Sequence, residues 1–267
     1  MNVKKYLRAG LLGFASLISY QANATVVEVR TVQGNFQINL FDETTPQSVA
    51  NFLSYVNSGA YANNVVHRSD NGFIIQMGGF QYNNSFPPDT VPSGVAVNNE
   101  PVLSNVRGTI AYAKLNGNPN SATSQFFINL GNNASNLDTQ NGGFTVFGQV
   151  IGDGMQVVDN IASLPTFGFN TPFNELPLRD YTTTDFNSTT LPDDTNLVII
   201  SDIVVVDATP ITNPDLDPAP NTLINSGGNG QPSNGGDSSS SGGAVNFILV
   251  LMLTLVIAVR RKARLLN

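Results

Sequence analysis

Residues 66–80 read VHRSDNGFIIQMGGF, and this stretch decides how the rest of the chain is interpreted. It places Arg68, one of only five basic residues between positions 25 and 243, close to Phe73, Gln76 and three glycines. An arginine keeps its charge in a protein, and its planar fork of donors can meet charge that develops on a bound group. The stretch is therefore the candidate centre of chemistry in this chain.

On both sides of this stretch the pattern is mainly that of β-strands. Alternating apolar residues flank Gln33-Gly34, which predicts a hairpin. Further strand-like runs cover residues 110–113, 125–130, 144–151 and 197–206.

Two segments follow a helical rhythm instead. The first has Thr45 as N-cap, Pro46 at the first helical position, apolar residues on one face and Gly59 at its end. The second lies near residues 155–162, with Asp153 as the predicted cap. Many strands with two distant helices predict a mainly β fold, a closed barrel whose ends the helices cover.

The motifs resemble those of the cyclophilins. Residues 66–80 are similar to the cyclophilin segment Phe-His-Arg-x-x-x-Gly-Phe-x-x-Gln-x-Gly, and SATSQFFIN at 121–129 resembles the second signature of that family. Residues 136–138 and 144–150 continue the resemblance in the same order, so that it covers roughly residues 25–206. It implies an eight-stranded antiparallel barrel with two α-helices, and peptidyl-prolyl cis-trans isomerase activity without a cofactor.

An X-Pro bond isomerises through a twisted amide with a barrier of about 18 to 20 kcal/mol, and no nucleophile or metal is required. A protein can hold the proline ring in an apolar slot while a fixed cation meets the charge that shifts as the amide twists. Arg68 suits this catalytic role. The resemblance implies these substrate-binding residues: Phe73, Ile74, Gln76, Ala113, Gln125, Phe127, Leu137 and Phe144.

Each of these residues also has an ordinary structural interpretation. The apolar ones could be core of a β domain, Arg68 could be a surface ion-pair partner, and both glutamines could simply bind backbone. The resemblance implies a structural role for His67. The sequence departs from the common family pattern at Ile74, Asn136 and Phe144, and the missing aromatic at 136 puts cyclosporin-type inhibitor binding in doubt more than activity.

Composition excludes several classes of function. The chain has one histidine and no cysteine, which leaves no two-histidine metal motif, disulfide or thiol nucleophile. No Gly-x-Ser-x-Gly elbow or phosphate-binding glycine loop with its lysine is present. Residues 25–243 hold five of the 12 basic residues and all 19 acidic ones, a net charge of −14 that argues against nucleic acid as a partner.

Both ends of the sequence carry targeting patterns. Three basic residues, an apolar run over 9–18 and Ala22-Asn23-Ala24 predict a signal peptide at 1–24. Residues 244–259 are almost wholly apolar and precede a basic end at 260–267, which predicts a membrane segment with a cytoplasmic end. The tail also resembles Gly-Gly sorting tails of Gram-negative bacteria, in which the tail is cut.

Between these ends the sequence predicts one domain at 25–207 and a disordered Pro/Gly/Ser/Asn-rich linker at 208–243. An inserted stretch at 166–196 has no assigned role. The expected protein is exported, periplasmic or at the cell surface, membrane-tethered or released, and acts on proline-containing polypeptides. The alternatives are a proline-peptide binding module or chaperone of weak activity, and a surface domain without a functional groove.

Overall fold

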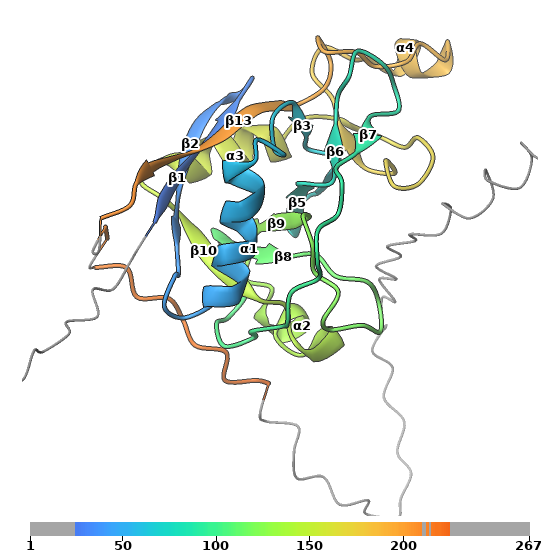
Figure 1. Cartoon of the computed structure of the whole chain (residues 1–267). Coiled ribbons are helices and arrows are strands. Elements are labelled where there is room, and N and C mark those ends of the chain that lie inside the picture. Colours follow the sequence, from blue (N-terminus) through green and yellow to red (C-terminus); the bar gives the residue numbers. More distant parts are fainter. Residues whose placement is uncertain (1–24, 210–211, 214, 225–267) are drawn as a thin grey trace, which may run out of the picture.

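The computed structural model describes residues 25–209, 212–213 and 215–224, and most of the strands build one antiparallel sheet (Figure 1). The sheet has eleven strands in the order β4-β5-β9-β8-β10-β2-β1-β13-β3-β6-β7. The strands are β1 (Val26–Thr31), β2 (Gly34–Leu40), β3 (Asn64–Val65), β4 (Arg68–Asp70), β5 (Ile74–Met77), β6 (Phe80–Gln81), β7 (Asp89–Thr90), β8 (Thr109–Tyr112), β9 (Phe126–Asn129), β10 (Val146–Ile151) and β13 (Ile199–Asp207).

A few short elements complete the described part of the chain. The strands β11 (Thr166–Phe167) and β12 (Leu176–Pro177) form a separate antiparallel pair. The helices are α1 (Pro46–Asn57), α2 (Ala134–Leu137), α3 (Gly154–Ala162) and α4 (Thr183–Asn187), with a 3-10 turn at Gln140–Gly142.

The strand predictions from alternating residues are confirmed. The chain turns at Val32 and Gln33, so that β1 and β2 pair from Val26↔Asn39 to Thr31↔Gly34. The strands β8, β9, β10 and β13 lie within the four further runs, to within a residue or two at their ends. Local apolar patterns were sufficient here because each strand has at least one face in the core.

The sheet curls because one chain segment takes part in two distant pairings. Residues 64–70 pair with β13 at β3 and with β5 at β4. Between these strands, the Val66 amide donates to the Val198 carbonyl at 3.0 Å, and the His67 amide donates to the Gln76 carbonyl at 3.1 Å. The fold is therefore a curled antiparallel sheet, whereas the closed eight-stranded barrel is not confirmed by the pairing order, which begins at β4 and ends at β7.

Helix α1 lies across the interior side of the curled sheet (Figure 1). Its Phe52 is fully buried and contacts the rings of Phe126 and Phe147, each at 5.3 Å between centroids. The helix begins after Thr45 and ends before Gly59, where φ is +70°, as predicted. The Thr45 side chain does not cap it, because its hydroxyl bonds back to the Phe41 carbonyl instead.

A distant carboxylate performs the capping of α1. Glu100 accepts hydrogen bonds from the Gln47 amide at 3.3 Å and from the Ser48 amide at 2.9 Å. It also accepts one from the Ser48 hydroxyl at 2.7 Å. A carboxylate at this end satisfies free amides and opposes the helix dipole. The capping residue therefore lies 52 positions away in sequence, and no local sequence pattern predicts it.

The second predicted helix is α3, which packs on β2 and β10 through Val158 and Ile161. Asp153 stands at its N-cap position, but the side chain makes no capping bond. The prediction is thus confirmed for the helix and wrong for the cap. The sequence did not predict the two short helices α2 and α4, since neither spans enough residues to show a helical period.

The buried apolar residues form three groups. The largest fills the curled sheet beneath α1 and α3. The second lies on the outer face of β5, β9 and β8 and includes Ile74, Phe127, Leu137 and Phe144. The third contains Phe80, Phe173 and Tyr181 and joins the stretch 166–196 to β3 and β6. This stretch projects at the end of the molecule where α4 lies (Figure 1).

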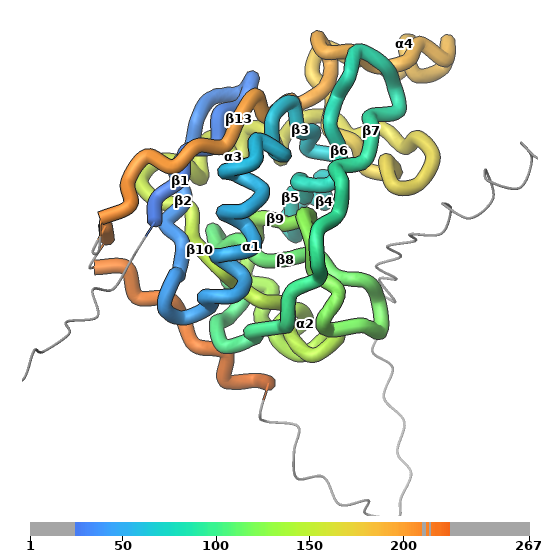
Figure 2. The backbone as a smooth tube through the Cα atoms, in the orientation of Figure 1, coloured from blue at the N-terminus to red at the C-terminus, as the bar shows by residue number. Residues whose placement is uncertain are grey.

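Part of the segment interpreted as a linker is bound to the domain. The Ser104 amide donates to the Ala219 carbonyl at 2.8 Å, and the Asn221 amide donates to the Val102 carbonyl at 2.9 Å. The Asn221 side chain also donates to the carbonyls of Pro101 and Asp138. Figure 2 shows this segment running along the edge of the domain towards α2. Specific contacts therefore continue to residue 224, beyond the predicted domain boundary at 207.

The predicted signal peptide, membrane segment and basic end lie outside the described residues. Within the described ranges, none of the helices has the length and apolar character that crossing a membrane would take.

Candidate active site

Strand register places the key polar and apolar side chains in one row. Arg68 on β4 pairs with Gln76 on β5, and Gln76 pairs in turn with Phe127 on β9. Directly opposed residues in an antiparallel sheet point to the same face. Asp70 and Ile74 form the next row on that face, because side chains two positions apart along a strand share a side. The sheet therefore sets an arginine beside an apolar surface.

This apolar surface holds a small recess. Its lining combines the middle of the sheet with the chain around α2, and seven predicted substrate-binding residues meet there: Phe73, Ile74, Gln76, Ala113, Phe127, Leu137 and Phe144. All but the half-buried Phe73 are buried. The recess is small, with a cavity volume of about 10 Å³.

The eighth predicted residue, Gln125, stands beside the recess. Its side-chain oxygen accepts a hydrogen bond from Gln76 Nε2 at 2.9 Å, which fixes the buried Gln76 amide. Its backbone carbonyl accepts from the Ala113 amide at 3.0 Å. Among the described residues, no donor reaches the Ala113 carbonyl, so this oxygen is the backbone group at Ala113 that a peptide could bind.

Arg68 is held by two carboxylates. Its Nε lies 2.7 Å from Glu175 Oε2, and its Nη2 lies 2.9 Å from Asp70 Oδ2. The Arg68 side chain is 21% exposed, and no described residue bonds to Nη1. Burial raises the pKa of Asp70, and the charge of Glu175 adds to this effect while Arg68 opposes it. The guanidinium is thus fixed on two edges with one nitrogen free.

Glu175 was not predicted as a site residue, because it is 107 positions from Arg68 in sequence. It lies in the stretch 166–196, just before β12. Its carbonyl accepts the Ser69 amide at 2.8 Å, so its backbone is fixed beside β4 as well. The inserted stretch therefore contributes directly to the surroundings of the arginine.

A buried lysine supports the chain behind the recess, and it too was missed. Lys114 Nζ donates to the carbonyls of Gly143 at 2.6 Å and Asn141 at 3.0 Å. It lies 4.7 Å from the centre of the Phe144 ring. Burial lowers the pKa of Lys114 to about 8. Its position directly after Ala113, among so few basic residues, was the signal that could have found it.

Buried polar groups fix both aromatic ends of the recess. Asp138 accepts hydrogen bonds from the Ser104 hydroxyl and the Asn105 amide, and Asn105 Nδ2 donates to the Phe144 carbonyl at 3.1 Å. On the other side, Asn133 Nδ2 donates to the Phe73 carbonyl at 2.9 Å. Satisfied buried networks of this kind hold backbone rigidly. The network accounts for the Asn and Asp residues of the motif region that make no contact with the recess.

His67 faces away from the recess. Its ring is buried and meets Phe80 edge-on, with 4.8 Å between centroids. The pKa of His67 is lowered to about 3, mainly by burial. A hydrogen bond with the Val65 backbone acts to raise the pKa, and the nearby charge of Arg68 acts to lower it. The imidazole is therefore neutral at physiological pH. Its place agrees with the structural role that the resemblance implied.

Gly78 shows why the motif ends in glycines. Its φ is +85°, and a Cβ at this position would collide with the Ser124 carbonyl oxygen. Only glycine lets β5 lie this close to the chain before β9.

As to metals, the described residues contain no group of three His, Asp or Glu side chains that could hold an ion.

The fold and site together define a class: a β protein in which an apolar recess lies beside a fixed arginine. A family model described as "Cyclophilin type peptidyl-prolyl cis-trans isomerase/CLD" matches residues 26–183. The chain therefore belongs to the cyclophilin-type peptidyl-prolyl cis-trans isomerase family, and its enzyme class is that of the family.

Similar proteins include isomerases of other bacteria. The chain is 45% identical over 152 residues to a peptidyl-prolyl cis-trans isomerase of Acinetobacter baylyi, covering 56% of this chain and 79% of the relative. It is 39% identical over 159 residues to peptidyl-prolyl cis-trans isomerase B of Escherichia coli, covering 58% and 94%. A crystal structure of a Cryptosporidium parvum cyclophilin type isomerase is 24% identical with a TM-score of 0.49, covering 69% and 98%.

Proposed function

We propose that this chain accelerates X-Pro isomerisation in exported polypeptides, with Arg68 as the catalytic residue and protein folding as the biological role. The observation that carries the proposal is the row of Arg68, Gln76 and Phe127 across three neighbouring strands. It joins a cation, an amide and an apolar surface within the width of a short peptide.

The free edge of Arg68 accounts for catalysis. As an X-Pro amide twists, its nitrogen loses conjugation and gains electron density, and a donor that is already fixed stabilises this state more than the planar one. Arg68 has its Nε and Nη2 bound to carboxylates, which leaves Nη1 for the substrate. Little reorganisation is then needed when the peptide binds.

The other residues act in binding. Phe73, Ile74, Phe127, Leu137 and Phe144 form the slot for the proline ring, which needs an apolar surface because the ring has no donor. The Gln76 amide and the Ala113 carbonyl bind the peptide groups next to it, with Gln125 orienting Gln76. Since the reaction breaks no bond, this set requires no nucleophile, metal or cofactor.

Export rests on the sequence at both ends. The basic and apolar run before Ala24 supports removal of a signal peptide, and the apolar segment at 244–259 with its basic end supports a membrane tether or a sorting tail. The proposed location is periplasmic or at the cell surface, with proline-containing polypeptides as substrates and the membrane as the site of attachment.

We also infer that the curled sheet closes into the eight-stranded barrel that the resemblance implies. Support comes from residues 64–70, which pair with β13 and with β5 within a single segment. Closure of this kind would hold β4, and with it Arg68, between two neighbours.

The test measures how fast the full chain isomerises an Ala-Pro peptide, using the exchange between cis and trans signals in NMR spectra. Arg68→Ala is expected to reduce the acceleration by roughly a hundredfold, as for loss of a preorganised donor in a catalytic site. Arg30→Ala, which removes an exposed arginine paired with Glu28, is the matched control and should keep full activity. An Arg68→Ala enzyme with unchanged activity would exclude the catalytic role.

A binding module is the second candidate, because Asn136 stands where the common family pattern has an aromatic residue at the rim of the pocket. Tight binding of an Ala-Pro peptide without faster exchange would support this candidate over the enzyme.

A further inference from the structure

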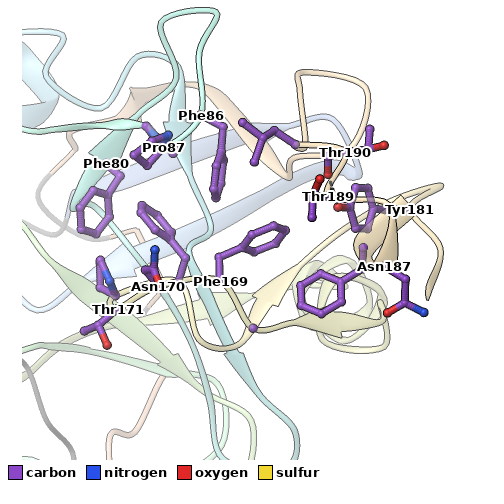
Figure 3. A pocket seen from close by; sticks show the side chains of 16 residues that line it. Phe80, Phe86, Pro87, Phe169, Asn170, Thr171, Tyr181, Asn187, Thr189 and Thr190 are labelled. Carbon is purple, nitrogen blue, oxygen red and sulfur yellow. Dashed lines mark hydrogen bonds between the residues drawn. The ribbon is translucent and has the colours of Figure 1, made fainter. Parts of the chain in front are cut away.

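A second cleft lies between the inserted stretch and the chain around β6, separate from the proline recess. It has a volume of about 890 Å³, within the range of ligand sites. Figure 3 shows Phe80, Phe86, Phe169 and Tyr181 lining it from several sides. These four rings come from β6, from the loop before β7 and from the chain on either side of β12. We call it the aromatic cleft.

The chemistry of the aromatic cleft selects a neutral, apolar ligand. Its walls hold aromatic rings and the prolines Pro87 and Pro172, its rim holds Asn and Thr side chains, and no charged residue lines it. The rings of Phe86 and Phe169 lie 4.9 Å apart and both are only half-buried. Leu191 at its edge is 58% exposed. Apolar surface left open in this way marks a site of interaction.

The cleft adjoins the proposed active site through two connections. Phe173 in its wall is two residues before Glu175, a separation of at most about 7 Å, and Glu175 contacts Arg68 at 2.7 Å. Phe80, also in the wall, packs on His67, the residue before Arg68. An extended peptide advances about 3.3 Å per residue, so a few residues beyond a proline at Arg68 can reach the cleft.

We propose that the aromatic cleft binds an apolar segment of the same polypeptide substrate, rich in aliphatic, aromatic or proline residues and a few residues from the bond that isomerises. The proposal rests on the proposed function for the position of that bond. Aromatic-lined grooves suit extended segments, since rings pack on side chains while Asn and Thr bind the backbone. The cleft thereby makes the enzyme prefer unfolded chains to short peptides.

The test compares an Ala-Ala-Pro-Ala tetrapeptide with versions extended on either side by six apolar or six Gly/Ser residues, using the full chain. One apolar extension is expected to lower KM roughly tenfold with kcat unchanged. Leu191→Asp should abolish this gain and leave the tetrapeptide rate unchanged. Val32→Asp is the matched control, because Val32 is 45% exposed and does not line the cleft, and it should keep the gain. No gain from either apolar extension, or a gain retained in Leu191→Asp, would overturn the proposal.

A titration with the six-residue apolar peptide alone separates this proposal from the proposed function. Amide resonances of Phe169 and Phe186 should shift in the wild type and not in Leu191→Asp. Binding without any turnover of the tetrapeptide would refute the isomerase function and keep the cleft. Absence of shifts would refute the cleft, and shifts driven by protein concentration alone would assign it to a second copy of the chain.

Discussion

At the scale of single residues, the surroundings of Arg68 are set by charge. Two carboxylates contact one guanidinium, at 2.9 Å from Asp70 and 2.7 Å from Glu175. Asp70 comes from the same strand and Glu175 from the inserted stretch. Glu175 is therefore a positioning residue in this arrangement, which touches the arginine rather than the substrate.

Glu175→Gln is expected to lower kcat/KM about two- to fivefold, because a partly exposed ion pair contributes on the order of 1 kcal/mol or less. The change should fall on kcat, since the guanidinium loses its orientation while the recess is unaltered. The measurement is peptide exchange at several substrate concentrations. Glu28→Gln removes the exposed pair with Arg30 and should have no effect. Equal rates for both variants would contradict the positioning role.

His67 gives the stability of the protein a defined pH dependence. Its pKa is about 3 in the folded state and about 6.5 when unfolded, so the unfolded chain binds more protons between these values. Stability is therefore lost as pH falls from 6.5 towards 3, and this residue accounts for about 2 kcal/mol between pH 7 and pH 5.

Urea unfolding at pH 7 and pH 5 measures this loss, and His67→Gln is the comparison because it cannot take up a proton. The sequence has a single histidine, so no other imidazole contributes. Between pH 7 and pH 5, the free energy of unfolding of the variant should fall by about 2 kcal/mol less than that of the wild type. The same pH dependence in both proteins would mean that His67 is not buried as a neutral ring.

At the scale of elements, polar contacts from distant residues stabilise helices and loops that local sequence patterns favour. Helix α1 has the proline and apolar face of a good helix, yet its first turn depends on Glu100. The chain around Phe144 likewise depends on Lys114 and Asn105. Helix α1 and the chain around Phe144 are thus each tied to a distant segment.

Glu100→Gln is expected to reduce the free energy of unfolding by about 1 to 2 kcal/mol, the usual range for loss of a helix cap. The control is Glu43→Gln, which removes the same charge from an exposed position shortly before the helix. Chemical denaturation measures the free energy of unfolding of the two variants, and Glu100→Gln should show the larger loss. Similar losses would show that net charge, rather than the cap, is responsible.

At the scale of the whole molecule, residues 215–224 bind the outside of the domain close to the recess. Leu216 packs on the apolar group that contains Phe127 and Phe144, and Asn221 bonds to the carbonyl of the buried Asp138. The inserted stretch and this segment therefore flank the site from two separate parts of the chain.

Asn221→Ala should destabilise the domain by about 1 to 3 kcal/mol, because one buried and one partly buried carbonyl lose their donor. Leu223→Ala serves as the control, since this side chain is 37% exposed. Thermal unfolding of the full chain gives the comparison. If Asn221→Ala unfolds at the wild-type temperature, the segment does not contribute to stability.

The sequence by itself determined the β character, the β1–β2 hairpin, the helices α1 and α3 and the residues that meet at the recess. The β character, the hairpin and the two helices follow from periodicity of 2 or 3.6 residues. The recess residues, which are spread over positions 73 to 144, were implied by the resemblance of the motifs to those of the cyclophilins. The tertiary structure decided the pairing of Arg68 with Glu175, the cap by Glu100, the burial of Lys114 and the aromatic cleft. The physical reason is that these contacts join segments up to 107 positions apart, and only the curl of the sheet brings their surfaces together.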